Sequence, residues 1–135
     1  MLNTKTAPYA VLLLRVSLGL LFLAHAATKV FIITLPGFVG FFASLGLPPF
    51  LAYAIVALET WGGLALILGI YAPLVALTLA IEVLATIVLV HAGKGWQAGK
   101  GGWEFPALWT VALIAICLLG DGPYALRPLG TVKRP

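Results

Sequence analysis

The stretch that decides the fold is LAYAIVALETWGGLALILGIYAPL, which runs from Leu51 to Leu74 and holds a single charged residue, Glu59. A run of about 20 apolar residues is long enough for a helix to cross the hydrocarbon core of a membrane. A carboxylate in the middle of such a helix costs roughly 3 kcal/mol unless a partner compensates for its charge. The stretch therefore indicates either the core of a soluble protein or a membrane helix in which Glu59 has a partner.

The composition decides between these two interpretations. Of the 135 residues, 62% are hydrophobic and only 9% are charged, whereas soluble domains carry about 25% charged residues. Twelve charged side chains cannot cover a 14.2 kDa globule with a solvated surface. We therefore predict one all-α integral membrane domain over residues 1–135, in contact with lipid. The net charge of +4 does not indicate nucleic acid as a partner, because the basic residues are scattered along the chain.

Four apolar runs predict a four-helix bundle in the membrane, with spans at about residues 8–30, 49–69, 72–92 and 104–120. The first run also imitates a secretory signal, since Ala24-His25-Ala26 fits a cleavage site. Arg15 interrupts its apolar region and three more runs follow, which favours a retained anchor. The basic residues number four on the side of the termini and three on the other side. This small excess predicts that both termini are cytoplasmic. The four are Lys5, Arg127, Lys133 and Arg134, and the three are Lys29, Lys94 and Lys100.

An uncharged segment between the first two spans contains a helical face of its own. Phe38, Phe41, Phe42 and Leu45 recur at the spacing of one side of a helix. We predict a short helix over about residues 36–46 that lies in the membrane interface. A re-entrant or irregular loop is the alternative.

Polar side chains inside the spans form a candidate network. Arg15 is the only permanent cation well inside a span, and Glu59 and Glu82 each lie near the middle of theirs. Because a guanidinium can satisfy a carboxylate at low dielectric, we expect Arg15 to pair with Glu59. Glu82 would then be protonated or bonded to hydroxyl groups. Such a network can serve helix packing alone or a working site. Gly62 and Gly63 predict a close helix–helix contact.

A second set of polar residues lies near one end of the spans and forms a candidate ligand-binding rim: His25, Lys29, His91 and Glu104. A quinone headgroup needs hydrogen-bond donors beside an apolar slot, and His25 and Lys29 with Trp61 or Trp103 could supply both. No metal site is predicted, because the spacings of His, Cys and Glu match no known ligand pattern. No nucleophile or phosphate-loop motif is present either, so no enzyme class follows and catalytic residues stay unassigned.

Three segments together resemble the DoxX family: LLLRVSLGLLFLAHAATKV, GFFASLGLPPFLAYAIVALETWGGLALILGIYAPLVAL and WEFPALWTVALIAICLLGDGPYAL. The more specific positions are Arg15, Gly19, Phe22, Lys29, Gly46, Leu47, Pro48, Glu59, Gly62, Gly63, Gly69 and Glu104. The chain differs from the family at Tyr71-Ala72-Pro73, at Leu126-Arg127 and at Glu82, which is a carboxylate in a span that is usually apolar.

The resemblance implies a four-helix protein of the inner (plasma) membrane, in a family linked to quinone-dependent oxidoreductase complexes. It suggests an accessory or quinone-interacting subunit with no intrinsic cofactor, a bound quinone as its ligand, and other membrane or redox subunits as partners. Catalysis by this chain alone is not expected. The alternatives are a structural or assembly subunit, a homo-oligomer among them, and a carrier of a small lipophilic molecule.

Overall fold

The computed structural model describes residues 3–130, which fold into five α-helices with no named β-strand. The helices are α1 (Ala7–Ala27), α2 (Leu35–Ser44), α3 (Pro49–Leu68), α4 (Ala72–Thr86) and α5 (Glu104–Leu119). The predicted all-α class is confirmed. Four helices correspond to the four apolar runs, and α2 corresponds to the short helix predicted between the first two.

Two of the long helices extend beyond their α-helical part. α1 continues as a π-helical turn over Thr28–Ile32, and α4 continues as one over Ile87–His91. A 3-10 turn over Ala92–Lys94 follows the second of these extensions. Three helical segments are then long and apolar enough to cross a membrane: Ala7–Ile32, Pro49–Leu68 and Ala72–Lys94. The chain is thus a multi-pass membrane protein.

The fourth crossing stays a prediction. α5 has 16 residues, which is about 24 Å at 1.5 Å per residue, and the hydrocarbon core is about 30 Å thick. The location of α2 in the membrane interface and the cytoplasmic side of the termini also stay predictions. Of the residues on which the orientation rests, Lys133 and Arg134 lie outside the described part of the chain.

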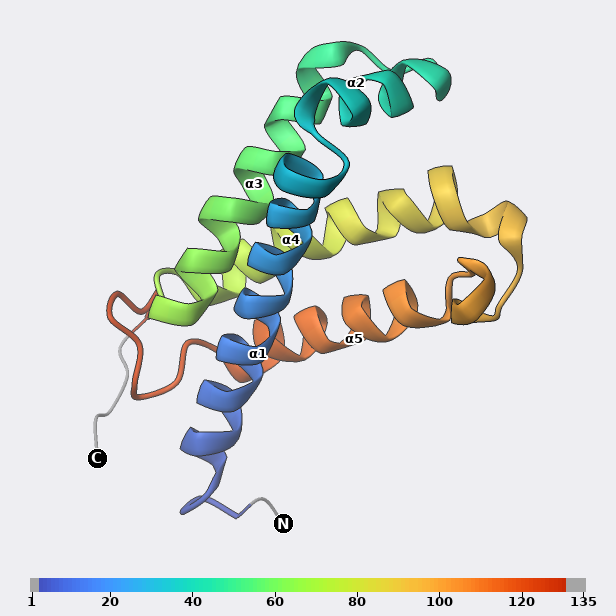
Figure 1. Cartoon of the computed structure of the whole chain (residues 1–135). Coiled ribbons are helices and arrows are strands. Elements are labelled where there is room, and N and C mark those ends of the chain that lie inside the picture. The colour runs from blue at the N-terminus through green and yellow to red at the C-terminus, as the bar shows by residue number, and fades with distance from the viewer. Residues whose placement is uncertain (1–2, 131–135) are drawn as a thin grey trace.

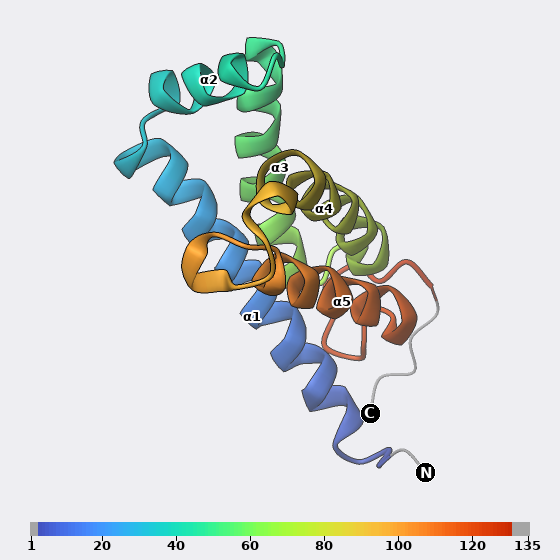
Figure 2. The ribbon, with the colours of Figure 1, turned by 90° about the vertical axis from the view of Figure 1, so that its right-hand side faces the viewer.

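The helices are arranged as two pairs (Figure 1). α1 packs mainly on α3, and α4 packs mainly on α5. The α4–α5 hairpin does not run parallel to the first pair but turns away from it, so the two pairs diverge on the side where α2 lies. Figure 2 shows α2 joining the ends of α1 and α3 on that side. The core lies where the pairs meet, around the fully buried side chains of Phe22, Leu66, Leu79, Leu113 and Ile116.

Glycines account for the close contact within the first pair. A methyl group at Gly19 of α1 would lie 2.6 Å from the carbonyl oxygen of Gly63 of α3, so a side chain at either position would push the helices apart. Gly62 faces the other way, and a methyl group there would lie 3.1 Å from the side chain of Leu79 on α4. The structure thus places both predicted packing glycines at helix contacts, on two different neighbours of α3.

The segment after α5 folds back onto the α3–α4 turn. The backbone N–H of Arg127 donates to the carbonyl of Gly69 at 3.0 Å, and the N–H of Tyr71 donates to the carbonyl of Arg127 at 2.8 Å. Gly69 ends α3 in a left-handed conformation, with φ at 68°, which glycine adopts at no steric cost. This segment therefore closes one end of the molecule, opposite the end that α2 covers.

Candidate ligand-binding pocket

Glu59 has a charged partner inside the helical bundle, because it forms an ion pair with Lys29 that joins α1 to α3. The ammonium Nζ of Lys29 lies 2.6 Å from both carboxylate oxygens of Glu59, and the Glu59 side chain is 3% exposed. The predicted pairing of Arg15 with Glu59 is therefore wrong. Arg15 is the only permanent cation well inside a span, but its guanidinium lies beside Gly69 at the end of α3, ten residues beyond Glu59. Because a helical side chain leans toward the N-terminus, Lys29 reaches back along α1 to the carboxylate.

Arg15 is buried at the opposite end and bonds to backbone instead. Its guanidinium donates to the carbonyl oxygens of Asp121 and Tyr124, both in the segment after α5. The Asp121 carboxylate in turn accepts from the backbone N–H groups of Ala72, at 2.7 Å, and Leu129, at 2.8 Å. Arg15 thus belongs to a cluster that fastens the end of the chain to the helices, separate from the site around Glu59.

Glu82, on α4, has no such partner. It is 8% exposed, and its Oε2 atom has no hydrogen-bond partner among the described residues. The hydroxyl groups expected to bond to it donate elsewhere: Thr78 to the carbonyl of Leu74, and Thr86 to the carbonyl of Val83. The predicted bonding of Glu82 to hydroxyls is therefore wrong, while its protonation stays a prediction.

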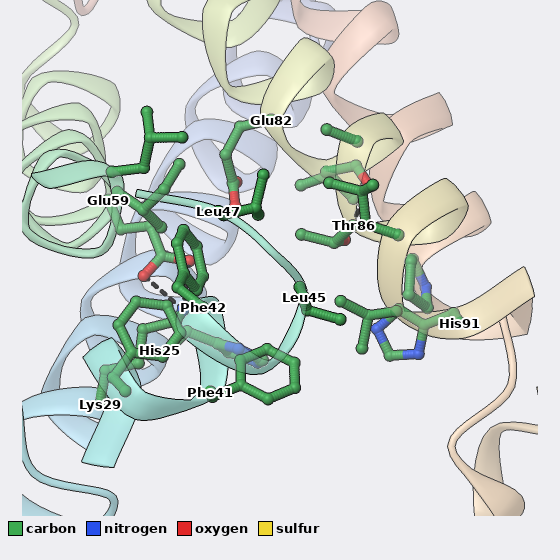
Figure 3. A pocket seen from close by; sticks show the side chains of 18 of the residues that line it. His25, Lys29, Phe41, Phe42, Leu45, Leu47, Glu59, Glu82, Thr86 and His91 are labelled. Atoms are coloured by element: carbon green, nitrogen blue, oxygen red, sulfur yellow. Dashed lines mark hydrogen bonds and ion pairs between the residues drawn. The ribbon is translucent and has the colours of Figure 1, made fainter. Parts of the chain in front are cut away.

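A pocket of about 440 Å³ lies between the two helix pairs and under α2 (Figure 3). Lys29, Glu59 and Glu82 line it. Figure 3 shows the Lys29–Glu59 pair on one wall, Glu82 beside it, and Thr86 and His91 on the opposite wall. The apolar lining is rich in aromatic and leucine side chains. These are Phe38, Phe41, Phe42, Leu45, Leu47, Leu51, Leu89 and Trp109.

The short helix α2 supplies much of that apolar wall. Phe38, Phe41, Phe42 and Leu45, which share one predicted helical face, all line the pocket. The Lys29 ammonium lies 5.4 Å from the ring centroid of Phe38, a distance at which a cation is attracted to an aromatic face. The helical face recognised in the sequence is therefore directed at the pocket.

Three of the four predicted rim residues reach this pocket, and one does not. His25, Lys29 and His91 line it. Glu104 instead accepts a hydrogen bond from the backbone N–H of Ala98 at 3.1 Å and helps to close the loop before α5. Of the aromatic residues, Trp109 lines the pocket in place of Trp61 or Trp103. Its ring centroid lies 4.8 Å from that of His25.

The polar network and the ligand-binding rim were predicted as two separate sites, but the structure brings their residues together in one pocket. Arg15 and Glu104 do not line that pocket. Sequence reasoning missed two features of it. Lys29 and His91 both lie in π-helical turns, which occur frequently at functional sites and leave no clear mark in a sequence. The second missed feature is Trp109, which lies within an apolar run of the sequence.

Whether a ligand binds in this pocket stays a prediction, as does the function of each residue. Across residues 3–130 there is no group of three or more His, Cys, Asp or Glu that could hold a metal.

These observations define an α-helical, multi-pass membrane protein with a largely apolar pocket that holds a buried ion pair and a free carboxyl group. The chain belongs to the DoxX family, whose model matches residues 10–92. It is also similar to the Bacillus subtilis (strain 168) protein named "Putative oxidoreductase CatD". The two are 32% identical over 124 residues, which cover 92% of this chain and 89% of that protein. No solved structure matches the chain.

Proposed function

We propose that the pocket binds a quinone-class molecule and that the chain serves as an accessory or quinone-interacting subunit of a membrane oxidoreductase. The observation that carries this proposal is the Lys29–Glu59 pair in the wall of an aromatic pocket of about 440 Å³. A site of that size suits a small molecule. Aromatic side chains such as Phe42 suit a flat ring, and the Lys29 ammonium has three donors, one more than its two contacts with Glu59 require.

The link to oxidoreduction rests on the relative as well as on the pocket. The Bacillus subtilis protein is named an oxidoreductase, and a chain that binds a quinone needs a partner to supply or remove electrons. We therefore include other membrane or redox subunits as partners, and the inner (plasma) membrane with cytoplasmic termini as the location.

A structural role is the second candidate, and one observation favours it. The Lys29–Glu59 pair joins α1 to α3, and a buried ion pair can serve only to select how helices pack. On this reading the chain stabilises or assembles a complex, and the pocket is filled by lipid.

A bulky substitution that fills the pocket distinguishes quinone binding from a purely structural role. Ala85 lines the pocket, whereas Val88 on the same helical segment is 73% exposed and does not. Each protein is purified from its native membrane in mild detergent, and the extracted quinones and co-purifying proteins are identified by mass spectrometry. We expect Ala85→Phe to lose most of the co-purified quinone, and Val88→Phe to retain it.

Two results would contradict the proposal. One is wild-type protein that carries no quinone above the level of the surrounding lipid extract. The other is equal quinone in the two variants, provided that both unfold at the wild-type temperature. Partner proteins that remain bound without any quinone would favour the structural role.

A further inference from the structure

The pocket holds more unpartnered polar groups than a site for plain hydrocarbon requires. Three buried side-chain N or O atoms in the described part of the chain have no hydrogen-bond partner. Two of them, Oε2 of Glu82 and Nε1 of Trp109, belong to residues that line the pocket. Buried polar groups are nearly always bonded in native proteins, so two exceptions in residues that line the same pocket point to a ligand that completes them.

The chemistry of these groups restricts the ligand. The indole N–H of Trp109 and the ammonium of Lys29 can only donate hydrogen bonds. Glu82 can donate as well, but only when it carries a proton. Donors on several side chains that line one pocket favour a ligand that presents acceptors, such as carbonyl oxygens, on an otherwise apolar ring.

Charge balance favours the protonated form of Glu82. The charged and titratable groups around it are Glu59 from α3, Lys29 from the end of α1, and the pocket residues His25 and His91. Lys29 already pairs with Glu59, so an ionised Glu82 would be a second negative charge with one cation between two carboxylates. An uncompensated charge in an apolar interior is costly, and a carboxyl group avoids that cost by keeping its proton.

We propose that Glu82 is a protonated carboxyl group that donates a hydrogen bond to a carbonyl oxygen of the bound headgroup, and that it selects carbonyl-bearing rings over hydrocarbon rings of the same shape. This inference rests on the proposed function, since it assigns the specificity of the same pocket. It makes Glu82 the residue that determines what the pocket accepts. The aromatic side chains of α2 determine only that the ligand is flat and apolar.

The test compares two probes of the same ring shape, duroquinone and durene, which differ in the two carbonyl groups. Saturation binding is measured to the full chain in lipid nanodiscs, and the uptake by empty nanodiscs is subtracted. The wild type is expected to bind duroquinone more tightly than durene. Glu82→Leu should weaken duroquinone binding by roughly threefold to tenfold, the value of one hydrogen bond, and leave durene binding unchanged. Glu82→Gln should retain most of the affinity, because its amide group still donates.

Thr78→Val is the matched control. Thr78 lies one helical turn before Glu82 on α4 and does not line the pocket, and its hydroxyl already donates to the carbonyl of Leu74 at 2.9 Å. The variant should therefore bind both probes as the wild type does. Infrared difference spectra supply a second readout. Adding duroquinone should shift the band of a protonated carboxyl group in the wild type, and that shift should be absent from Glu82→Gln.

The outcomes separate this inference from the proposed function. If Glu82→Leu binds duroquinone as tightly as the wild type, the pocket is a binding site and the specificity assigned to Glu82 is wrong. If the spectra show an ionised Glu82, the donor role is wrong. If neither probe binds the wild type above the empty nanodisc level, the proposed function fails, and this inference fails with it.

Discussion

The two ends of the molecule bury charged side chains in different ways. At the closed end, Arg15 and Asp121 are 1% and 5% exposed, and their partners are backbone carbonyl and N–H groups of the last described segment. At the α2 end, Lys29 and Glu59 pair with each other, and Glu82 keeps an oxygen without a partner. The α2 end also encloses a pocket of about 440 Å³.

This difference distinguishes a polar cluster that only stabilises the fold from a ligand-binding site. Backbone groups near Arg15 are held in place by the fold and bond to its guanidinium, of which Nε alone has no partner. A site for a ligand needs free volume as well, beside polar atoms whose partners arrive with the ligand. We therefore expect substitutions at the closed end to change the stability of the protein, and substitutions at the α2 end to change mainly what it binds.

The largest loss of stability is expected for Arg15→Leu. It removes the cation that holds the carbonyls of Asp121 and Tyr124 and leaves the Asp121 carboxylate buried without a nearby positive charge. We expect the free energy of unfolding in detergent to fall by about 3–5 kcal/mol. Arg15→Lys should lose less, because it keeps the charge but not the fork that reaches two carbonyls. Thermal unfolding curves that coincide with the wild-type curve would show that this cluster does not fasten the end of the chain.

A smaller loss is expected for Asp121→Ala at the same end. The carboxylate accepts from the N–H of Ala72 in the first turn of α4 and from the N–H of Leu129. Without it, two backbone donors lose their partner, and we expect a loss of about 2–3 kcal/mol. Asp121→Asn retains one acceptor oxygen and should lose about half as much. An Asn variant that is as unstable as the Ala variant would mean that the charge, and not the hydrogen bonds, matters.

At the α2 end, the Lys29–Glu59 pair should contribute less. The Lys29 side chain is 15% exposed, so after Glu59→Ala its ammonium can move toward the headgroup region and recover some solvation. A double-mutant cycle with Lys29→Met and Glu59→Gln should give a coupling energy of about 1–2 kcal/mol. A coupling near zero would mean that the two side chains do not pair in the membrane. A coupling energy as large as the loss of stability expected for Arg15→Leu would mean that the buried charges at the two ends contribute equally to stability.

The same contrast explains what sequence reasoning could and could not find. Membrane class, helix boundaries and the face made by Phe38, Phe41 and Phe42 depend on local periodicity and composition, and the structure has the helices and this face where they were predicted. The partner of Glu59 depends on the register between α1 and α3. Periodicity within either helix does not encode that register, so the depth of the cation within its span favoured Arg15 over Lys29.

Hydrogen bonds from side chains to distant backbone groups are the second kind of contact that could not be predicted from the sequence. The cation at position 15 bonds to carbonyl groups at positions 121 and 124, and carbonyl groups occur at every residue, so no side-chain pattern singles them out. Glu104 was grouped with the rim by its side of the membrane, yet it bonds within its own loop. Periodicity therefore predicts which face of a helix is polar, but contacts between distant backbones decide which of those polar groups meet.

The smallest effect, with the opposite sign, is expected for Glu82→Leu. Glu82 is nearly as buried as Asp121, but its Oε2 bonds to nothing, so removing the carboxyl group breaks no bond at that atom. A leucine of similar size leaves no unsatisfied polar group and suits the apolar lining from Val83 and Leu89. We expect the free energy of unfolding of the ligand-free protein to rise by up to about 1 kcal/mol. A loss of 2 kcal/mol or more, about the size expected for Asp121→Ala, would show that Glu82 has a structural partner and that the polar clusters at both ends only stabilise the fold.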